Sequence, residues 1–83
     1  MSDGTLIGTI PKNSREEVRI ALDTFKGIEL LDIRVFATFD NDTDGERRPT
    51  RKGISVKVER LPELIAALQM AEAEARRRGL LNG

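Results

Sequence analysis

The sequence has no cysteine, histidine, tryptophan or tyrosine, and three phenylalanines are its only aromatic residues. Without cysteine, a disulfide framework and thiolate chemistry are excluded. Without histidine as well, the common zinc sites, the Ser-His-Asp triad and the Cys-His pair are impossible. The G-x-x-x-x-G-K-[ST] phosphate loop is also missing. We therefore expect a protein that is not an enzyme and that holds no metal ion or cofactor.

The sequence also has no excess charge and no long hydrophobic run. Fourteen lysines and arginines balance fourteen aspartates and glutamates, so the formal net charge is zero. A neutral chain gains no global attraction to nucleic acid, so any such binding must come from a local patch. No apolar run approaches the ~20 residues of a membrane helix, and the N-terminus does not resemble a signal peptide. We therefore expect a cytoplasmic protein without a membrane partner.

The length of the chain has a consequence for its assembly. Eighty-three residues make one small domain. A chain of this mass buries only about 63% of the surface that its unfolded form exposes. Without a disulfide or a metal, self-association is a usual remedy for so small a core. We therefore expect a homo-oligomer.

Alternation of apolar and polar residues predicts four strands, over residues 17–22, 28–39, 46–50 and 54–58. The links between them are short, which favours antiparallel pairing. Residues 23–27 have the composition of a turn, and Gly53 indicates a bulge or a tight corner. Residues 1–15 are expected to form an N-terminal arm or a short edge strand, which Pro11 ends.

The last part of the chain is predicted to form one amphipathic helix. Its apolar residues recur at helical spacing: Leu61, Leu64, Ile65, Leu68 and Ala75. Pro62 suits the first helical position, and Gly79 suits the residue just beyond the helix. This apolar stripe should cover the core face of the sheet. The expected fold class is therefore α+β, a four-stranded antiparallel sheet followed by one C-terminal helix.

The predicted strand over residues 28–39 has two unlike faces. Its residues of odd number from Leu31 to Phe39 are apolar and should face the core. The other face carries Asp32, Arg34, Phe36 and Thr38. A cation and an aromatic ring therefore lie side by side where water should be. The residues that alternation places outward on other strands, or at the neighbouring turn, are Arg19, Lys57, Phe25 and Lys26.

Cations and exposed rings on one sheet face are typical of proteins that bind single-stranded nucleic acid. Phosphates need positive charge, and unpaired bases need flat surfaces on which to stack. A run without acids adds further cations: Arg47, Arg48, Arg51 and Lys52. Two alternatives remain, namely that the run is solvated strand surface and that Phe36 packs against another subunit or a loop.

The acidic segment before this run has the beginning of a calcium loop. Asp40, Asp42, Asp44 and Gly45 match the opening of the EF-hand pattern. The bidentate glutamate of that pattern should occupy its twelfth position, which is Arg51 here, and a cation there would repel calcium. The flanking elements are also predicted strands. A solvated hairpin turn is therefore the favoured interpretation.

Three segments in order resemble the transcriptional positive cofactor 4 family of single-stranded DNA-binding coactivators. They are Phe25-Lys26-Gly27, Leu31-Asp32-Ile33-Arg34 and the stretch from Arg48 to Ser55, R-P-T-R-K-G-I-S. The resemblance covers about residues 16–75. It implies a curved four-stranded sheet, one helix, pairing of two chains largely through their helices, and channels for single strands.

The resemblance also implies functional residues. DNA-contact positions carried over from the family are Phe25, Lys26, Arg34, Arg48, Arg51 and Lys52, and Phe36 replaces an aromatic that members place just after the D-I-R motif. This sequence departs from the family at Val35, where many members carry an acid, and no Trp or Tyr follows, so the stacking platform is smaller. The helix residues expected at a dimer contact are Leu64, Leu68, Ala71 and Ala75.

The sequence therefore predicts a homodimeric single-stranded DNA-binding protein of low sequence specificity, nucleoid-associated and active as a transcription coactivator or regulator. Residues 16–79 would form the binding domain and residues 80–83 a C-terminal tail. The candidate nucleic-acid-binding residues are Phe25, Lys26, Arg34, Phe36, Arg48, Arg51, Lys52, Arg19 and Lys57. Alternative ligands are single-stranded RNA and melted duplex. A rival interpretation is a protein-interaction module whose basic sheet face binds an acidic partner, such as part of the transcription machinery.

Overall fold

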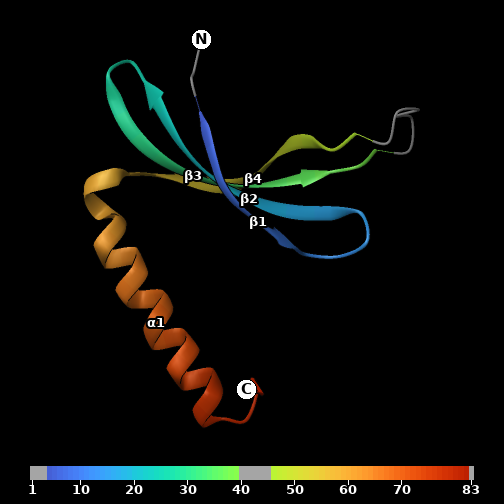
Figure 1. Ribbon diagram of the computed structural model, residues 1–83, viewed down its shortest axis with the longest axis vertical. Helices are drawn as coiled ribbons and strands as arrows, with labels where there is room; N and C mark the ends of the chain where they lie inside the picture. Colours follow the sequence, from blue (N-terminus) through green and yellow to red (C-terminus); the bar gives the residue numbers. More distant parts are fainter. Residues whose placement is uncertain (1–3, 40–45, 83) are drawn as a thin grey trace.

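The computed structural model describes residues 4–39 and 46–82. The elements in chain order are β1 (Thr5–Pro11), β2 (Glu16–Phe25), β3 (Ile28–Ala37), β4 (Arg48–Lys57), the 3-10 turn η1 (Val58–Arg60) and α1 (Leu61–Arg77). The strands form one open antiparallel sheet in the order β1-β2-β3-β4. The helix leaves the end of β4 at a steep angle to the sheet (Figure 1). The predicted fold class, four antiparallel strands and one C-terminal helix, is confirmed.

The sheet has the predicted number of strands, but its membership differs from the prediction. β1 pairs with β2 from Thr5↔Leu22 to Pro11↔Glu17, so the N-terminal segment is an edge strand of the sheet. The segments 46–50 and 54–58, predicted as two strands, belong to the single strand β4, which a bulge interrupts. A bulge shifts the alternation of side chains, so one bent strand has the sequence pattern of two short ones.

The hairpin between β2 and β3 is longer and tighter than predicted. β2 continues to Phe25, which pairs with Ile28, so only Lys26 and Gly27 form the turn. Both have positive φ, 52° and 80°. Such a two-residue turn matches the right-handed twist of the strands that it joins. The hairpin curls away from the side of the sheet on which α1 lies (Figure 1).

The helix α1 has well-defined ends. It begins one residue earlier than predicted, so Pro62 is its second residue, where a missing N–H is also harmless because the first turn has no intrahelical acceptors. Gly79 follows the helix with φ 76°, as predicted. The Leu80 N–H donates to the Ala75 carbonyl at 2.8 Å and the Gly79 N–H donates to the Arg76 carbonyl at 3.0 Å. These two backbone hydrogen bonds together form the Schellman motif.

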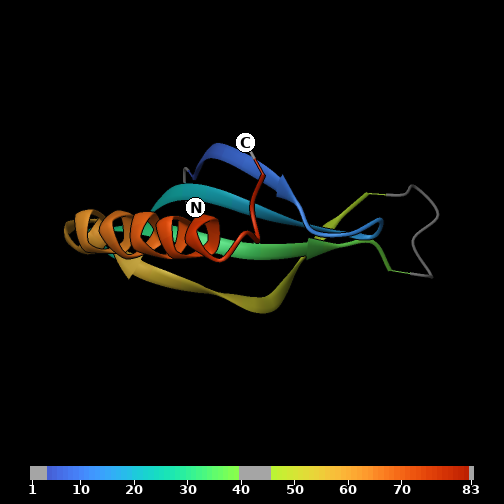
Figure 2. The same ribbon diagram turned by 90° about the horizontal axis from the view of Figure 1, so that it is seen from below.

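The helix does not cover the sheet, which corrects the expectation from its apolar stripe. Its first turns lie near the sheet and the rest extends away from it (Figures 1 and 2). An open apolar groove of about 300 Å³ separates the two, lined among others by Leu22 and Ile33 of the sheet and by Leu64 and Leu68 of the helix. Since the helix diverges from the sheet, one chain alone leaves this stripe open to solvent.

The core within one chain is correspondingly small. Among the described residues, only Leu31 and Ala37 are buried, at 5% and 9% exposure. Phe39 was predicted on the core face, but β3 ends at Ala37 and Phe39 is exposed. Alternation orients side chains only within a strand, so it no longer applies at Phe39.

Candidate nucleic-acid interface

The pairing register brings the predicted cations and ring to one face of the sheet. Arg19 of β2 lies opposite Arg34 of β3, and Glu17 lies opposite Phe36. Lys57 of β4 lies opposite Leu30, which has the same parity along β3 as Arg34 and Phe36. We call this side the charged face; its polar and aromatic members are Glu17, Arg19, Asp23, Phe25, Asp32, Arg34, Phe36, Ser55 and Lys57. The opposite side, with Ile20 against Ile33 and Leu22 against Leu31, is the apolar face.

The tight turn places a ring and a cation at one end of the charged face. Phe25 has the parity of Arg19 along β2 and is 59% exposed. The Lys26 Nζ lies 5.4 Å from the centroid of this ring, within the range of a cation–π contact. Because the turn has only two residues, both side chains project from the tip of the hairpin, and the Phe25 ring is accessible for stacking.

Arg34 occupies the centre of the charged face and is held on two sides. Its Nη2 and Nε donate to Asp32 Oδ1 and Oδ2 at 3.0 and 3.3 Å, and its Nη1 donates to the Thr50 carbonyl at 3.1 Å. The Ser55 hydroxyl donates to Asp32 Oδ1 at 2.7 Å. Partial burial raises the pKa of the Asp32 carboxyl, but the hydrogen bonds from Arg34 and Ser55 and the Arg34 charge outweigh it, so this pKa lies below its ordinary value.

Glu17 holds two further arginines of the interface. The Arg19 Nε donates to Glu17 Oε2 at 2.5 Å, and the Arg47 Nη1 donates to Glu17 Oε1. Hydrogen bonds from Arg19 and Arg47, with their charges, hold the pKa of the Glu17 carboxyl below its ordinary value. The Arg19 Cζ also lies 4.1 Å from the centroid of the Phe36 ring. Arg19 is therefore both ion-paired and stacked.

Sequence reasoning placed Glu17 and Asp32 on this face but missed their role as partners of its arginines. Each lies two residues before an arginine of the same strand, namely Arg19 and Arg34. Residues i and i+2 of a strand point to the same side. This spacing was the available signal that the face would balance part of its own charge.

Gly53 allows β4 to bend at the bulge. Between the pairs Arg34↔Gly53 and Phe36↔Pro49, β3 has one residue and β4 has three. Gly53 has φ 151°, and a Cβ there would lie 2.3 Å from the Ile33 carbonyl oxygen, so the close approach of the strands requires glycine. The three bulged residues, Thr50, Arg51 and Lys52, lie where β4 bows outward from β3 (Figure 2).

Thr50 fixes the shape of this bulge. Its hydroxyl donates to the Val35 carbonyl at 2.9 Å and accepts from the Lys52 N–H at 3.1 Å. The bulge therefore has a defined conformation, and it presents the exposed side chains of Arg51 and Lys52 at the edge of the sheet. Arg48 is also exposed at the start of the same strand, opposite Ala37.

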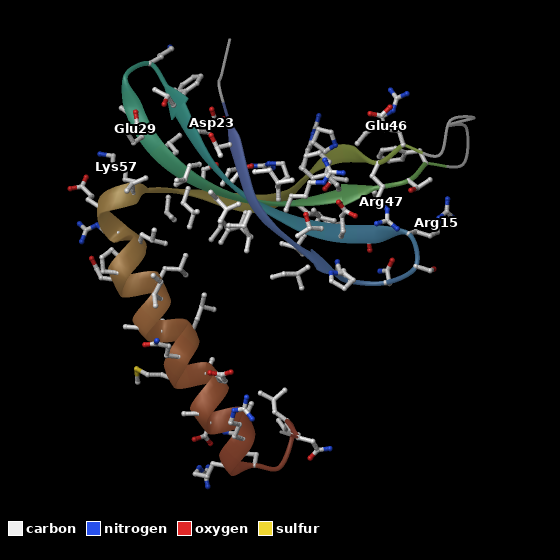
Figure 3. All side chains as sticks on the ribbon, in the orientation of Figure 1. Arg15, Asp23, Glu29, Glu46, Arg47 and Lys57 are labelled. Atoms are coloured by element: carbon white, nitrogen blue, oxygen red, sulfur yellow. The ribbon has the colours of Figure 1, made fainter. Side chains whose placement is uncertain are left out.

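The cations of the interface fall into two groups. Arg19, Arg34 and Arg47 are each ion-paired with a carboxylate of the charged face. Arg51 and Lys57, in contrast, make no ion pair within residues 4–39 and 46–82. Lys57 lies at the helix end of β4, whereas Arg47 lies at the opposite end of the sheet (Figure 3). The charged face thus has ion-paired arginines, whereas Arg51 and Lys57 on the β4 edge have no acidic partner among the described residues.

The acidic segment from Asp40 to Gly45, for which we favoured a solvated turn, lies outside the described residues. In the parts of the chain that are described, His, Cys, Asp and Glu form no group of three or more that could hold a metal ion. None of the described helices is long and apolar enough to cross a membrane.

The helix residues expected at a dimer contact lie along one side of α1. Leu64 and Leu68 line the apolar groove. Ala71 and Ala75 lie further along the helix, beside Leu80 of the C-terminal segment. Leu68 is 58% exposed, so this side of the helix is accessible to a second polypeptide.

The structural class of this chain is defined by two features. One is an open four-stranded antiparallel sheet with a charged and an apolar face, and the other is a single helix that diverges from it. Residues 12–67 match the family model of Transcriptional Coactivator p15 (PC4), and the chain belongs to this family. It is a family of DNA-binding transcription coactivators and their homologues. The resemblance carried by the F-K-G, D-I-R and R-K-G-I-S segments is therefore confirmed.

Solved structures of bacterial and phage homologues have the same fold. The chain is similar to BPSL1147, a PC4 homolog from Burkholderia pseudomallei K96243. Its orthorhombic crystal form is 32% identical, with a TM-score of 0.73 and coverage of 83% of this chain and 89% of that one. Its tetragonal form is 31% identical, with a TM-score of 0.72 and coverage of 84% and 98%.

A more distant match is the bacteriophage T5 homolog of the eukaryotic transcription coactivator PC4, implicated in recombination-dependent DNA replication. It is 26% identical, with a TM-score of 0.65 and coverage of 92% of this chain and 86% of that one. No curated protein sequence matches the chain at a significant level.

Proposed function

We propose that this protein is a non-enzymatic homodimer that binds single-stranded DNA with little sequence preference and acts in the cytoplasm, at the nucleoid, as a transcription coactivator or regulator. One observation carries the proposal. The charged face combines an aromatic side chain near each end with exposed cations along the β4 edge. Phe25 lies eight positions along β2 from Glu17, the cross-strand partner of Phe36. This is roughly 27 Å of strand, enough for several nucleotides.

The cations of the β4 edge suit the phosphates of such a strand. Arg51 and Lys52 on the bulge, Arg48 before them and Lys57 at the other end of β4 are all exposed. Arg34 uses three of its five N–H groups within the protein, and the other two remain for a phosphate. Lys26 steers the backbone at the hairpin tip. Because these contacts release counterions, binding should weaken steeply with salt.

The stacking surfaces favour single strands over duplex. Aromatic side chains attract unpaired bases of any sequence, since every base has a π-face. In a duplex the bases are already stacked, and a rigid rod cannot follow a curved sheet. The same activity would serve recombination-dependent DNA replication, the process in which the phage T5 homolog is implicated.

The homodimer is supported by the excess surface of one chain. Its accessible area is 6643 Å², whereas a monomeric protein of 9.3 kDa exposes about 5,000 Å². The radius of gyration is 15.2 Å, compared with about 12 Å for a compact domain of this length. An excess of roughly 1,600 Å² per chain corresponds to an obligate interface by size.

A second copy of the chain is the occupant that fits this surface. Each chain offers both an apolar sheet face, with Ile54 51% exposed, and an apolar helix stripe that includes Leu68. A two-fold axis brings the same patch of both chains together, so the stripe of one chain can cover the sheet face of the other. Leu64, Ala71 and Ala75 would continue the contact along α1.

The experiment that tests the proposal is fluorescence anisotropy with a labelled single strand of about 20 nucleotides. The unlabelled single strand, the matching duplex, single-stranded RNA and heparin serve as competitors, and the titration is repeated over a range of salt. We expect tight binding that the duplex displaces poorly and that weakens as salt rises. Absence of binding at low salt contradicts the proposal.

The same titration separates the alternatives. Equal displacement by duplex, heparin and single-stranded DNA would favour the protein-interaction module, whose acidic partner these polyanions mimic. The described side chains offer no chemistry that selects the 2′-hydroxyl, so RNA has to be tested directly. Stronger displacement by RNA than by DNA would mean that the ligand is single-stranded RNA. The observation against the first alternative, the protein-interaction module, is that Arg19, Arg34 and Arg47 are already ion-paired with Glu17 and Asp32.

A further inference from the structure

Two side chains on neighbouring strands form a stack near the end of the charged face that lies away from the β2–β3 turn. Arg19 lies opposite Arg34, and Glu17 lies opposite Phe36, so Arg19 and Phe36 are diagonal neighbours within reach of each other. The Arg19 Cζ is 4.1 Å from the Phe36 ring centroid, the distance of a guanidinium lying on an aromatic face. One face of the ring is therefore occupied by arginine.

The two phenylalanines of the charged face thus offer different surfaces. Phe25 at the hairpin tip is largely exposed. Phe36 is half-buried and has Arg19 over it, while the Arg19 side chain itself remains 32% exposed. A ligand that approaches this point meets the guanidinium. Planar, delocalised guanidinium groups stack on bases as aromatic rings do.

Glu17 fixes the guanidinium in this position. Its Oε2 accepts from the Arg19 Nε at 2.5 Å, and its Oε1 accepts from Arg47. Arg47 is itself anchored, because its Nη2 donates to the Ser14 carbonyl at 3.1 Å. The carboxylate is therefore held from one side and orients Arg19 on the other. Its single negative charge is shared between Arg19 and Arg47 and offsets part of the Arg19 charge, so what Arg19 offers to a ligand includes a flat surface as well as charge.

We propose that the Arg19 guanidinium, supported by Phe36 and oriented by Glu17, is the surface on which an unpaired base stacks near the Phe36 end of the charged face. This inference rests on the proposed single-strand binding. It assigns Arg19 to base stacking and not to phosphate neutralisation, and it makes Phe36 a support beneath the guanidinium. Glu17 is a positioning residue that acts through Arg19.

The test compares two ligands of equal length, a labelled single strand of about 20 nucleotides and an abasic strand with the same sugar-phosphate backbone. Loss of one stacked base lowers affinity by about 5- to 150-fold. We expect Arg19→Ala to lower affinity for the normal strand by an amount in this range and to leave the abasic strand nearly unaffected. Arg19→Lys keeps the charge but lacks the plane, so it should behave like Arg19→Ala.

Arg51→Ala is the matched control, because it also removes one arginine but from the bulge. It should weaken binding of both strands alike. Equal losses of Arg19→Ala on the normal and abasic strands, or wild-type affinity of Arg19→Lys, would overturn the inference and assign Arg19 to phosphate. If the wild-type protein binds neither strand, the proposed function fails; if it binds and Arg19→Lys is neutral, only this inference fails.

The role of Glu17 has a separate readout. Glu17→Gln keeps the shape of the side chain but releases the charges of Arg19 and Arg47. We expect the preference for the normal over the abasic strand to fall and the salt dependence of binding to steepen, since each newly available cation adds about 0.7 to the slope for a single strand. If Glu17 had only a structural role, Glu17→Gln would lower affinity for both strands and leave the salt dependence unchanged. That result would contradict the positioning role of Glu17.

Discussion

The two faces of the sheet are made by the same strands, yet only one of them is complete within a single chain. On the charged face, Glu17 and Asp32 are ion-paired and accept hydrogen bonds. On the apolar face, Ile54 and Leu22 stay exposed and the helix stripe diverges from them. Ion pairs and hydrogen bonds between residues i and i+2 need only one strand and its neighbours. Burial of apolar area needs a second layer, which this chain places away from its own sheet.

This difference implies that the charged face and the apolar face have separate roles. The apolar face and the stripe of α1 carry assembly, and hence most of the stability. The charged face carries ligand binding and contributes little to stability, because ion pairs near the surface are each worth at most about 1 kcal/mol. Substitutions on the two faces should therefore have effects of different kind and size.

The largest effect is expected at the apolar stripe. Leu68→Asp places a charge where the second chain should pack, so we expect the dimer to dissociate and the chain to lose cooperative unfolding. The free energy of unfolding per chain should fall by about 2–5 kcal/mol, the range for large-to-small core changes. Sedimentation velocity and thermal unfolding at several protein concentrations measure both effects.

Met70→Asp is the control for this substitution. Met70 lies about 200° around the helix from Leu68 and is 73% exposed. Its change should leave the dimer and the unfolding temperature nearly unaltered. A Leu68→Asp protein that stays dimeric, or equal effects of both changes, would show that this stripe is not the interface.

The second largest effect, a loss of stability, is expected at Gly53 in the bulge of β4. In Gly53→Ala, the new Cβ would lie 2.3 Å from the Ile33 carbonyl oxygen and 2.9 Å from the Arg34 Cα. The strands must separate, which also displaces the Thr50 carbonyl from Arg34. We expect a loss of about 2–4 kcal/mol in the free energy of unfolding, from overpacking and backbone strain together, measured by urea denaturation.

Gly8→Ala in β1 provides the comparison. A Cβ at Gly8 would have no atom within 4 Å, so its change should alter stability by less than about 1 kcal/mol. If Gly53→Ala were equally harmless, the close approach of β3 and β4 would not depend on glycine.

A smaller and purely functional effect is expected on the charged face. Arg51→Ala removes an unpaired cation without removing any described ion pair, so stability should not change. The slope of log affinity against log salt for a single strand should fall in magnitude by about 0.7. Arg77→Ala on the helix, which loses its ion pair with Glu74, should leave that slope unaltered. An identical slope in all three proteins would remove the bulge from the interface.

Local patterns in the sequence predicted the features that depend on neighbouring residues. Strict alternation placed Arg34, Phe36 and Lys57 on one side because their strands are regular there. The turn at Gly27 and the helix end at Gly79 followed from the freedom of glycine to adopt positive φ.

The features that failed depend on contacts distant in the sequence. The bulge at Gly53 divided β4 into two apparent strands, and the pairing of β1 along β2 could not be read from its few alternating residues. The direction of α1 is set by the geometry after Lys57, and an apolar stripe does not specify whether its own sheet or that of a partner covers it. Glu17 was accessible to strand periodicity, but its contact with Arg47 joins residues 30 positions apart.

The smallest effect that we expect is a difference in how stability depends on pH. Hydrogen bonds from Arg19 and Arg47 hold the pKa of the Glu17 carboxyl below its ordinary value. A carboxyl with a lowered pKa in the folded state stabilises the fold above its unfolded pKa of about 4.3, and this contribution disappears as the pH falls through the folded value. Glu17→Gln should therefore be slightly less stable than wild type at pH 7 and equally stable near pH 2. A variant of the apolar helix stripe such as Leu64→Ala should keep its deficit in stability at both pH values, because burial of apolar area does not titrate. Urea denaturation of the three proteins at both pH values measures this difference, and a Glu17→Gln deficit that is the same at pH 2 would mean that the side chain acts through packing and not through its charge.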